Sequence, residues 1–485
     1  MENLKPYDYK IQKIENIKTE ISLNDKEKEI FNFFISHNSK NTIFRVAGGW
    51  VRDKLLGKNS EDIDITLDNI TGQEYIKNLK NEKVEFKEII NSNSKSSHLQ
   101  TATIEIFNKT IDIVNLRKEI YKEKSRIPEI SIGTPEEDSF RRDITINSLF
   151  YNINTNQIED FTKKGIEDLK NSLIRMTKEC IISFNEDPLR MLRVIRFASR
   201  FQFKLDKDII DNINKEFFIK LFNEILSNQR IEKELSLMME NFYAYSSVYM
   251  LYKFNLLKSC LKFDEGKNED YIKCVNMMIL GNCLKENFWS DFNKNDVKIL
   301  NYALLTSPFK IYENKIKKNN EIGSKIILSQ ILKIHNNEVN DIITIINNII
   351  IIKKLINQNK LERLNIGLAF RNIKEKYIKK IIILSICEEY IEKNNQNVII
   401  ENLNKEIFDL IVKKYGDFYK FLIDEHLDKI NEMKPLLNGK DIKKELNISD
   451  GKQIGILLSY LIEEQIKNPK ITKDEAIIVL KNIKK

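Results

Sequence analysis

The chain has 485 residues and a formal net charge of +8, and it contains five cysteines and four histidines. This length suits an enzyme with roughly three or four packed subregions, and the mild excess of positive charge favours a polyanionic partner such as nucleic acid. The cysteines are odd in number and widely spaced, without a C-x-x-C pair, so neither a disulfide framework nor a zinc site is implied.

Neither a targeting segment nor a membrane span is recognisable in the sequence. Residues 1–20 are polar and carry mixed charge, and the longest apolar run, at 349–352, is far too short to cross a bilayer. The isoleucines between 342 and 356 follow helical spacing, which predicts a buried helix face. We therefore expect an intracellular, cytoplasmic protein that does not enter a membrane, with the nucleus and the mitochondrion as alternatives.

Short β-like runs alternate with polar turns between residues 41 and 160, which is typical of an α+β domain. Strands are predicted at 43–46, 63–67, 101–107, 110–114 and 149–153, and one of the turns at 91–94. After about residue 173 the strand patterns fade, and long amphipathic helices are predicted instead. The expected fold class is therefore α+β, with a small mixed β-sheet first and helices after it.

A glycine pair, Gly48 and Gly49, follows the first predicted strand, and Arg52 lies three residues further on. Glycines allow backbone N–H groups to approach a triphosphate closely, where a Cβ atom would interfere. We therefore interpret residues 47–53 as a phosphate-binding turn supported by Arg52.

Asp62 and Asp64 lie on the next predicted strand, and because side chains alternate along a strand, both point to the same face. Two carboxylates at this spacing are suitable ligands for one or two Mg²⁺ ions, which phosphoryl or nucleotidyl transfer requires. A lone Asp-x-Asp is more commonly a pair of solvated acids on a surface hairpin. The neighbouring glycine turn and Arg52 favour the metal site.

The segment 136–150 contains Arg142 and Asp143 shortly after a cluster of acids. Arg142 can hold a triphosphate or ribose oxygen through its guanidinium, and Asp143 can accept a hydrogen bond from a ribose hydroxyl, so the pair would favour ribonucleotides. The alternative is an ordinary helix start with acids in its first turn and an exposed Arg-Arg pair. The motif alone leaves both interpretations open.

Residues 186–197 predict a helix that begins near Pro188 and carries charged side chains at every third position. These are Asp187, Arg190, Arg193 and Arg196, and the predicted buried face contains Leu189, Leu192 and Ile195.

Asp187 and Arg190 present a hydrogen-bond acceptor beside donors. Cytosine and adenine offer the complementary amino group and ring nitrogen, whereas uracil and guanine do not, so the pair would accept CTP and ATP and reject UTP and GTP. Arg193 and Arg196 would face phosphates or an RNA backbone. The alternative, an i,i+3 salt bridge between Asp187 and Arg190 on a solvated helix, is weakened by the two further arginines.

In this order, the three blocks resemble the class II tRNA nucleotidyltransferases, the CCA-adding enzymes, and the related bacterial-type poly(A) polymerases. Residues 159–170 are similar to the hinge motif of the family. Residues 227–235 are similar to the motif that supports the base-reading helix, although Gln229 stands where Glu is common. Residues 437–442 and 451–455 resemble the tail of the family.

Residues 115–121, 125–128 and 133–138 resemble the eukaryotic branch of this family. This stretch lies where the family has a flexible loop that is needed for the final A addition. The resemblance therefore favours complete CCA addition over CC addition alone.

The resemblance implies a head, neck, body and tail arrangement. The nucleotidyltransferase head would cover residues 1–172, and the helical neck with the base-reading helix would cover 173–245. A helical body at 246–370 and a helical tail at 371–485 would hold the acceptor and T-arm stack of tRNA through phosphates and 2′-hydroxyls.

Roles for individual residues follow from the same resemblance. Asp62 and Asp64 would bind Mg²⁺, and a third carboxylate would help to activate the primer hydroxyl. Asp112, on the strand at 110–114, is the candidate for this carboxylate, and Glu105 is the runner-up. The nucleotide-binding residues carried over are Gly48, Gly49 and Arg52 for the triphosphate, Arg142 and Asp143 for the sugar, and Asp187 and Arg190 for the base, joined by Arg193 and Arg196.

The implied function is template-independent addition of C, C and A to the 3′ end of tRNA from CTP and ATP, by a protein expected to be monomeric. A poly(A) polymerase of the same superfamily, a CC-adding or A-adding enzyme, and a non-catalytic RNA-binding paralogue are the alternatives. The presence of Asp62, Asp64, Asp187 and Arg190 argues against the paralogue.

Overall fold

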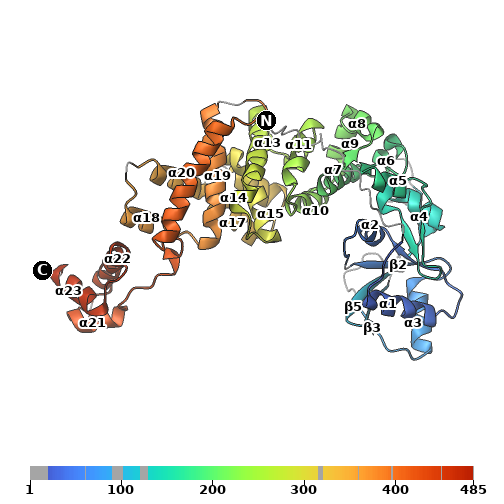
Figure 1. The fold of residues 1–485 in the computed structure, drawn as a ribbon, viewed down its shortest axis with the longest axis horizontal. Helices are drawn as coiled ribbons and strands as arrows, with labels where there is room; N and C mark the ends of the chain where they lie inside the picture. The colour runs from blue at the N-terminus through green and yellow to red at the C-terminus, as the bar shows by residue number, and fades with distance from the viewer. Residues whose placement is uncertain are drawn as a thin grey trace. The chain divides into compact units, whose positions relative to one another are not determined.

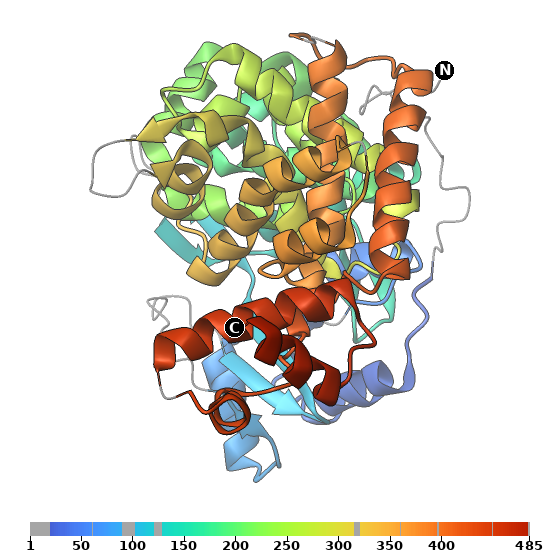
Figure 2. The same cartoon turned by 90° about the vertical axis from the view of Figure 1, so that its left-hand side faces the viewer.

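The computed structural model describes residues 20–60, 62–89, 102–120, 129–314, 321–358, 360–394, 397–448 and 450–483. The chain forms two compact units that divide between Lys262 and Phe263, and Figures 1 and 2 show their elements from two directions. The predicted turn at 91–94, the segment 125–128, residues 1–19 and residue 101 lie outside the described residues.

A mixed seven-stranded sheet forms the centre of the first unit, with the strands in the order β3-β4-β5-β2-β1-β8-β9. The pair β2–β5 is parallel, and the other neighbours are antiparallel. The predicted mixed sheet and its five predicted strands are confirmed, with shifts of one or two residues at their ends. The strands are β1 (Phe44–Ala47), β2 (Ile63–Leu67), β3 (Lys87–Glu88), β4 (Ala102–Ile106), β5 (Lys109–Asn115), β8 (Phe150–Asn152) and β9 (Gln157–Glu159).

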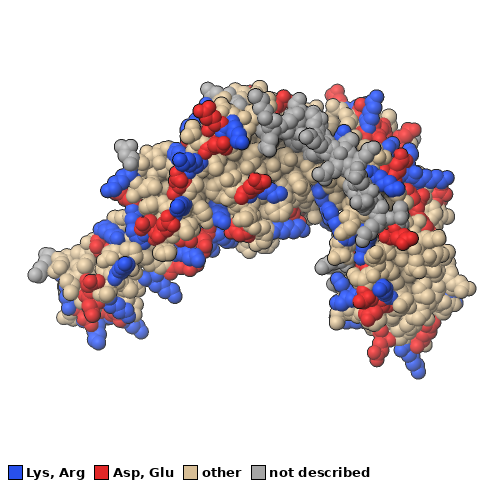
Figure 3. Space-filling view, in the orientation of Figure 1, with Lys and Arg blue, Asp and Glu red and all other residues tan. Residues whose placement is uncertain are grey.

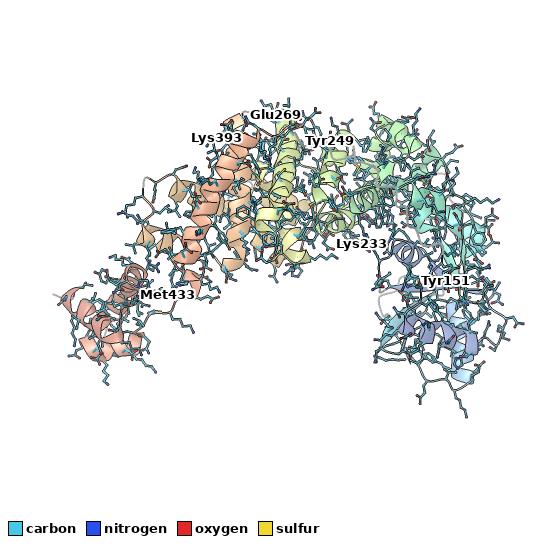
Figure 4. All side chains as sticks on the ribbon, viewed as in Figure 1. Tyr151, Lys233, Tyr249, Glu269, Lys393 and Met433 are labelled. Carbon is cyan, nitrogen blue, oxygen red and sulfur yellow. The ribbon has the colours of Figure 1, made fainter. Side chains whose placement is uncertain are left out.

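Aromatic side chains pack the early helices onto this sheet. Phe34 stacks on Tyr75 with ring centroids 5.5 Å apart, and both rings contact Phe44 of β1. Trp50 lies 5.7 Å from Tyr151 of β8, which Figure 4 labels. The helices are α1 (Asp25–Ser36), α2 (Gly49–Leu55), which follows β1 directly, and α3 (Gly72–Asn81).

A hairpin that the sequence patterns did not predict follows the sheet strand β5. Its strands β6 (Arg117–Ile120) and β7 (Glu129–Ile132) are antiparallel. Asp138 fixes the base of the hairpin, because one carboxylate oxygen accepts the backbone N–H of Arg117 at 3.0 Å. The chain continues through α4 (Pro135–Arg141), a 3-10 turn at Thr145–Asn147, and α5 (Gly165–Lys170).

The rest of the first unit is mainly helical, and α7 (Leu189–Phe201) lies at its centre, packed against α10 and α11. The predicted helix after Pro188 and its buried face are confirmed, since Leu189, Leu192 and Ile195 are buried. A two-stranded parallel ladder, β10 (Leu173–Ile174) with β11 (Lys204–Leu205), interrupts the helices. The other helices are α6 (Cys180–Glu186), α8 (Lys207–Asn212), α9 (Glu216–Ile225), α10 (Asn228–Met239), α11 (Ala244–Lys253) and α12 (Leu257–Leu261).

The second unit is built from helices, and α17, α19 and α20 pack side by side (Figures 1 and 2). The predicted buried isoleucine face belongs to α17, where Ile345, Ile349 and Ile352 are buried while Ile350 is exposed. The longer helices are α13 (Asn268–Cys283), α15 (Lys294–Thr306), α17 (Asn336–Ile356), α19 (Glu375–Asn394), α20 (Lys405–Asp424) and α22 (Gly451–Lys467).

The last three helices form a small core of their own, in which Ile442, Leu461 and Leu480 are buried.

Shorter elements complete the second unit. The shorter elements are α14 (Lys285–Phe288), β12 (Glu313–Asn314), β13 (Glu321–Ile322), α16 (Gly323–Ile326), α18 (Arg363–Phe370), α21 (Gly439–Leu446) and α23 (Lys473–Ile483), with 3-10 turns at Ser307–Ile311 and Ile430–Glu432 and a π-helical turn at Ile327–Ile331.

Charges of both signs are mixed over the described surface that Figure 3 presents, with Lys and Arg next to Asp and Glu. This agrees with the modest net charge of +8. In the described part of the chain, no helix combines the length and the apolar composition that crossing a membrane requires.

Candidate active site

A row of acidic side chains crosses one face of the sheet. Ile63 and Ile65 are buried, and the alternation of β2 therefore exposes Asp62 and Asp64 on the same side, as predicted. Asp64 is the direct neighbour of Asp112 in the parallel β2–β5 pair.

Asp112 is better placed beside Asp64 than Glu105. The Thr103 hydroxyl donates to Asp112 at 2.7 Å from the neighbouring strand β4. Glu105 lies opposite Thr110, two pairs further along the strands, and forms an ion pair with Lys87 at 2.8 Å. The structure thus brings Asp112, rather than Glu105, into one row with Asp64.

The electrostatics of this row suit a cation. Burial raises the pKa of Asp64, the carboxylates of Asp112 and Asp62 raise it further, and only Arg142 acts in the opposite direction. Hard oxygen ligands that repel each other fit a divalent cation such as Mg²⁺, which would remove the repulsion. Within the described ranges, however, no three His, Cys, Asp or Glu side chains converge closely enough to enclose a metal ion without other ligands.

The glycine turn serves a different purpose at each of its two positions. Gly48 has a φ of +71°, and its N–H donates to the carbonyl of Leu149 at 2.9 Å, so this N–H is not available to a phosphate. A Cβ atom at Gly48 would lie 2.8 Å from Nη1 of Arg142. Gly48 therefore provides the space that Arg142 occupies, and triphosphate binding at this turn stays a prediction. Gly49 lines the cavity described below.

Arg52 is buried at the side of this turn, with an exposed fraction of 4%. Its Nε donates to Asp53 at 2.8 Å, and its Nη1 donates to the side-chain oxygen of Asn147. Burial lowers the pKa of Arg52, and the carboxylate of Asp53 counteracts this effect. Its guanidinium is therefore held in one orientation by two acceptors.

Arg142 is held by the carboxylate that also anchors the β6–β7 hairpin. Its Nε and Nη2 both lie 2.9 Å from Oδ2 of Asp138, and its Nη1 donates to the carbonyl of Asn147 at 3.3 Å. Asp138 also accepts from Arg141 at 2.6 Å. Although Asp138 is buried, these arginines lower its pKa, so the carboxylate remains charged.

Asp143 is buried beside α7 and forms an ion pair with Arg193. Nε and Nη2 of Arg193 lie 2.7 and 2.6 Å from Oδ2 of Asp143. The other oxygen accepts the N–H of Ile144 at 2.9 Å and the amide of Asn147 at 3.3 Å. Burial would raise the pKa of Asp143, but Arg193 and these hydrogen bonds lower it to about 2.

The pair predicted to read the base, Asp187 and Arg190, lines one cavity without a bond between the two side chains, although the backbone N–H of Arg190 donates to the carbonyl of Asp187 at 3.0 Å. Asp187 ends α6 and accepts Nη2 of Arg230 at 2.7 Å and the N–H of Leu189 at 3.1 Å. Arg190 is buried and donates to Glu186 at 2.8 Å. The alternative of a simple salt bridge between Asp187 and Arg190 is therefore not what the structure contains.

The arginine face of α7 is less exposed than the sequence suggested. Arg196 is 8% exposed, and its Nε donates to Glu234 of α10 at 2.6 Å. Arg193 reaches the same carboxylate at 3.4 Å. Within the segment 227–235, Glu234 therefore bonds directly to α7, and Arg230 bonds to Asp187 just before that helix. Gln229 is exposed, so its departure from the family pattern does not alter these bonds.

A cavity of about 510 Å³ collects most of these side chains. Eight of the predicted nucleotide-binding residues line it, whereas Gly48, Asp62, Asp64 and Asp112 do not. Seven arginines against three carboxylates make it a site for an anion. Its lining consists of Gly49, Arg52, Glu119, Arg141, Arg142, Asp143, Asn147, Asp187, Arg190, Arg193, Arg196, Phe197 and Arg200.

Asn147 is the main residue of the site that the sequence analysis missed. It contacts Arg52, Arg142 and Asp143, and therefore links the glycine turn with the Arg-Arg-Asp segment. Asn147 could have been identified from the sequence, because it lies within the candidate functional segment 136–150. Glu119 and Arg200 also line the cavity and were not predicted.

Comparison with known proteins yields a family model and full-length relatives. The model described as the poly A polymerase head domain matches residues 44–175. The protein named CCA tRNA nucleotidyltransferase, mitochondrial, of Saccharomyces cerevisiae is 29% identical over 504 aligned residues, which cover 92% of this chain and 89% of the relative. The tRNA nucleotidyltransferase cca2 of Schizosaccharomyces pombe is 32% identical, and the alignment covers 96% of this chain and 99% of the relative.

A solved structure has the same fold over nearly the whole chain. The CCA-adding enzyme of Thermotoga maritima, in complex with tRNA, matches with a TM-score of 0.66 at 17% identity, over 96% of this chain and 97% of the other. The predicted fold, a head with a mixed sheet followed by a mostly helical region, is thus confirmed by a known protein as well as by the elements described above.

Proposed function

Because the chain belongs to the tRNA nucleotidyltransferase family, we propose that it adds C, C and A to the 3′ end of tRNA from CTP and ATP, without a template and with release of pyrophosphate. The observation that carries this proposal is the alignment with the relative from Schizosaccharomyces pombe, which extends over 99% of that protein. The arginine-lined cavity and the row of carboxylates also support this function, because their chemistry suits a nucleotide and a divalent cation.

The length of the matches favours a tRNA substrate over poly(A) synthesis. The poly A polymerase head model ends at residue 175, whereas the full-length relatives named for tRNA continue through the second unit. We retain the proposed head at 1–172, neck at 173–245, body at 246–370 and tail at 371–485, and we propose that body and tail bind tRNA. We further propose that the protein acts as a monomer.

In the proposed reaction, the nucleotide lies in the cavity with its triphosphate near Arg52 and Gly49. Asp187 would read the base, since each of its oxygens accepts one bond and retains capacity for an amino group. One hydrogen on Nη2 of Arg190 already bonds to the carbonyl of Arg141. The other hydrogen on Nη2 would donate to the base.

The sugar would lie between Arg142 and Asp143. The two oxygens of Asp143 already accept four N–H groups, which fills the usual capacity of a carboxylate. A ribose hydroxyl would therefore replace the longest of these bonds, the 3.3 Å bond from Asn147.

Asp62 and Asp64 would hold Mg²⁺ on the exposed face of β2. Bound there, Mg²⁺ would lower the pKa of the primer hydroxyl and neutralise charge on the phosphates of the nucleotide. Asp112 would accept the proton of the 3′-hydroxyl as that oxygen attacks the α-phosphate. Arg52 would stabilise the departing pyrophosphate through its fixed guanidinium.

The location is proposed from the relatives. The proteins of Saccharomyces cerevisiae and Candida glabrata carry the word mitochondrial in their names. We therefore propose that the protein acts in the mitochondrion, in addition to the cytoplasm and nucleus that the sequence analysis considered.

A primer-extension assay tests the function. A tRNA transcript that ends at its discriminator base is incubated with Mg²⁺ and CTP, ATP, both, UTP or GTP, and the products are separated at single-nucleotide resolution. Growth by C, C and A followed by a stop is expected. A stop after two C residues would identify a CC-adding enzyme, growth only on tRNA that already ends in CC an A-adding enzyme, and a long A ladder a poly(A) polymerase. Absence of growth on every RNA end would favour the RNA-binding paralogue.

The same assay tests base reading by a single residue. Asp187→Ala is expected to lose the preference for CTP and ATP over UTP and GTP, because the acceptor for the exocyclic amino group is removed. If this variant still excluded UTP and GTP, a side-chain template that includes Asp187 would be ruled out.

A further inference from the structure

Two aromatic rings on α7 are in contact with several cations. Phe197 and Phe201 are one helical turn apart, and their rings are nearly parallel, with centroids 6.0 Å apart and an angle of 1° between the planes. The Arg52 guanidinium carbon lies 4.7 Å from the centroid of Phe201 and 5.6 Å from that of Phe197. Phe201 is also contacted by Arg200 at 5.2 Å and Lys58 at 5.5 Å.

The second ring has its own cationic neighbours. The guanidinium carbons of Arg196 and Arg193 lie 4.1 and 5.5 Å from the centroid of Phe197. All of these distances are within the range where a cation is attracted to the negative face of an aromatic ring. The pair of rings therefore contacts four of the seven arginines that line the cavity.

The arginines need such a partner because the cavity contains few carboxylates. Burial lowers the pKa of Arg52, and the charge of Arg200 lowers it further, while Asp53 and, to a smaller extent, Asp143 act in the opposite direction. Arg200 reaches Asp53 only at 4.0 Å. The π faces attract cations without adding a negative charge that would repel a triphosphate.

We propose that Phe197 and Phe201 are positioning residues that hold the Arg52 guanidinium in the orientation needed to bind a triphosphate or pyrophosphate. Asp53 and Asn147 fix two edges of this guanidinium, and the ring of Phe201 covers its face. The inference rests on the proposed function, since it assigns an anion to the cavity, and it deepens that function by naming what orients the group that binds this anion.

The proposed role depends on the charge distribution of the ring, whereas ordinary packing depends on its shape, so the two can be distinguished. Phe201 is replaced by mono-, di- and trifluorophenylalanine through site-specific incorporation, which weakens the π face with little change in shape. The affinity for inorganic pyrophosphate is measured by calorimetry for the intact protein. We expect a graded loss that reaches roughly threefold to tenfold for the trifluoro variant.

Substitutions of Phe201 by other natural amino acids provide a second series of variants. Phe201→Leu is expected to weaken pyrophosphate binding, and Phe201→Trp to preserve it, because only the latter keeps a π face. Phe218→Leu is the matched control, since Phe218 is a buried ring of the same unit that packs against Phe184 and not against a cation in any described contact. This control is expected to lower thermal stability without changing pyrophosphate affinity.

Kinetics provide a readout that a merely structural role would not move. The KM values for CTP and ATP are expected to rise by the same factor in Phe201→Leu, because both nucleotides share the triphosphate. A pyrophosphate affinity that does not respond to fluorination, or a KM change for only one nucleotide, would overturn the proposal. If the parent protein extended no RNA but the affinities were still graded, the proposed function would fail and the role of the rings would stand.

Discussion

The acidic row on the sheet and the arginine cavity beside α7 belong to the same unit and are built in opposite ways. In the row, burial and the neighbouring acids raise the pKa of Asp64, and Arg142 is the one charge that opposes them. In the cavity, the arginines are already bonded, Arg52 to Asp53 and Arg193 to Asp143. An added cation would therefore relieve the repulsion in the row, whereas the side chains of the cavity are bonded to one another before an anion arrives.

The largest effect is expected from a change in the row. Asp64→Asn should reduce nucleotide incorporation by about a thousandfold, because a proposed metal ligand is lost. The same variant should unfold less readily at neutral pH than the parent protein. The pKa of Asp64 is raised in the folded protein, so its ionised form destabilises the fold as pH rises from below the unfolded value.

Chemical denaturation at two pH values checks this second expectation. At pH 7 the Asp64→Asn protein should be more stable than the parent. Below about pH 3, where the carboxyl group is mostly protonated in both states, the difference should vanish. A variant that is less stable at pH 7 would show that Asp64 is paired in solution and that the contrast between row and cavity is wrong.

The corresponding change in the cavity should act on stability. Arg193→Gln is expected to reduce the free energy of unfolding at pH 7 by about 3 kcal/mol, because the buried carboxylate of Asp143 loses its cation. Urea denaturation measures this difference. The exposed pair Lys220–Glu224, at 3.9 Å on α9, offers a control, and Lys220→Gln should change stability by less than about 0.5 kcal/mol.

The pH dependence of the same pair has a defined sign. The pKa of Asp143 is lowered to about 2, so its contribution to stability is present above the unfolded value and is lost as pH falls toward 2. The parent should lose stability between pH 4 and pH 2, and Arg193→Gln should lose less in this window. Equal slopes for the two proteins would show that Arg193 does not cause the low pKa.

The third carboxylate can be identified by comparing two acids on the same sheet face. Asp112→Asn is expected to reduce the rate of incorporation by about a hundredfold, because Asp112 is the neighbour of Asp64 and the proposed proton acceptor. Glu105→Gln should have a small effect, since Glu105 is paired with Lys87. Single-turnover kinetics measure both rates. The reverse ranking would assign the role to Glu105.

The smallest effect concerns the cation itself. Mg²⁺ at about ten times its dissociation constant should stabilise the parent by about 1.4 kcal/mol, because binding to the folded state removes the repulsion among the acids. The melting temperature should rise by roughly 2–4 °C. Asp64→Asn should lose this rise and Glu105→Gln should keep it. An equal rise in all three proteins would place the cation elsewhere.

Local patterns were sufficient to predict β2 and α7, two of the elements that carry the site, but not the β6–β7 hairpin that contributes Glu119. The alternation around Ile63 and Ile65 placed Asp62 and Asp64 on one face, and Pro188 marked the start of α7. These features depend on neighbours within a few residues, and a single sequence contains that information.

The bonding inside the cavity could not be predicted in the same way. Asn147 bonds Arg52 across 95 residues of sequence, and Arg230 bonds Asp187 across 43. Such pairs depend on how α2, α6 and α10 pack, which local spacing does not encode. For the same reason the sequence left a salt bridge between Asp187 and Arg190 open as an alternative, although each side chain has a different partner in the structure.

The parallel pairing of β2 and β5 limits how this chain can change in evolution. Ile65 pairs with Ile113 directly beside the pair of Asp64 with Asp112, and both isoleucines are fully buried. Insertion or deletion of one residue in either strand would move an acid into the core or an isoleucine into solvent. The lengths of these two strands are therefore fixed by the core and by the chemistry together, so point substitutions remain the open route by which the acidic row can vary.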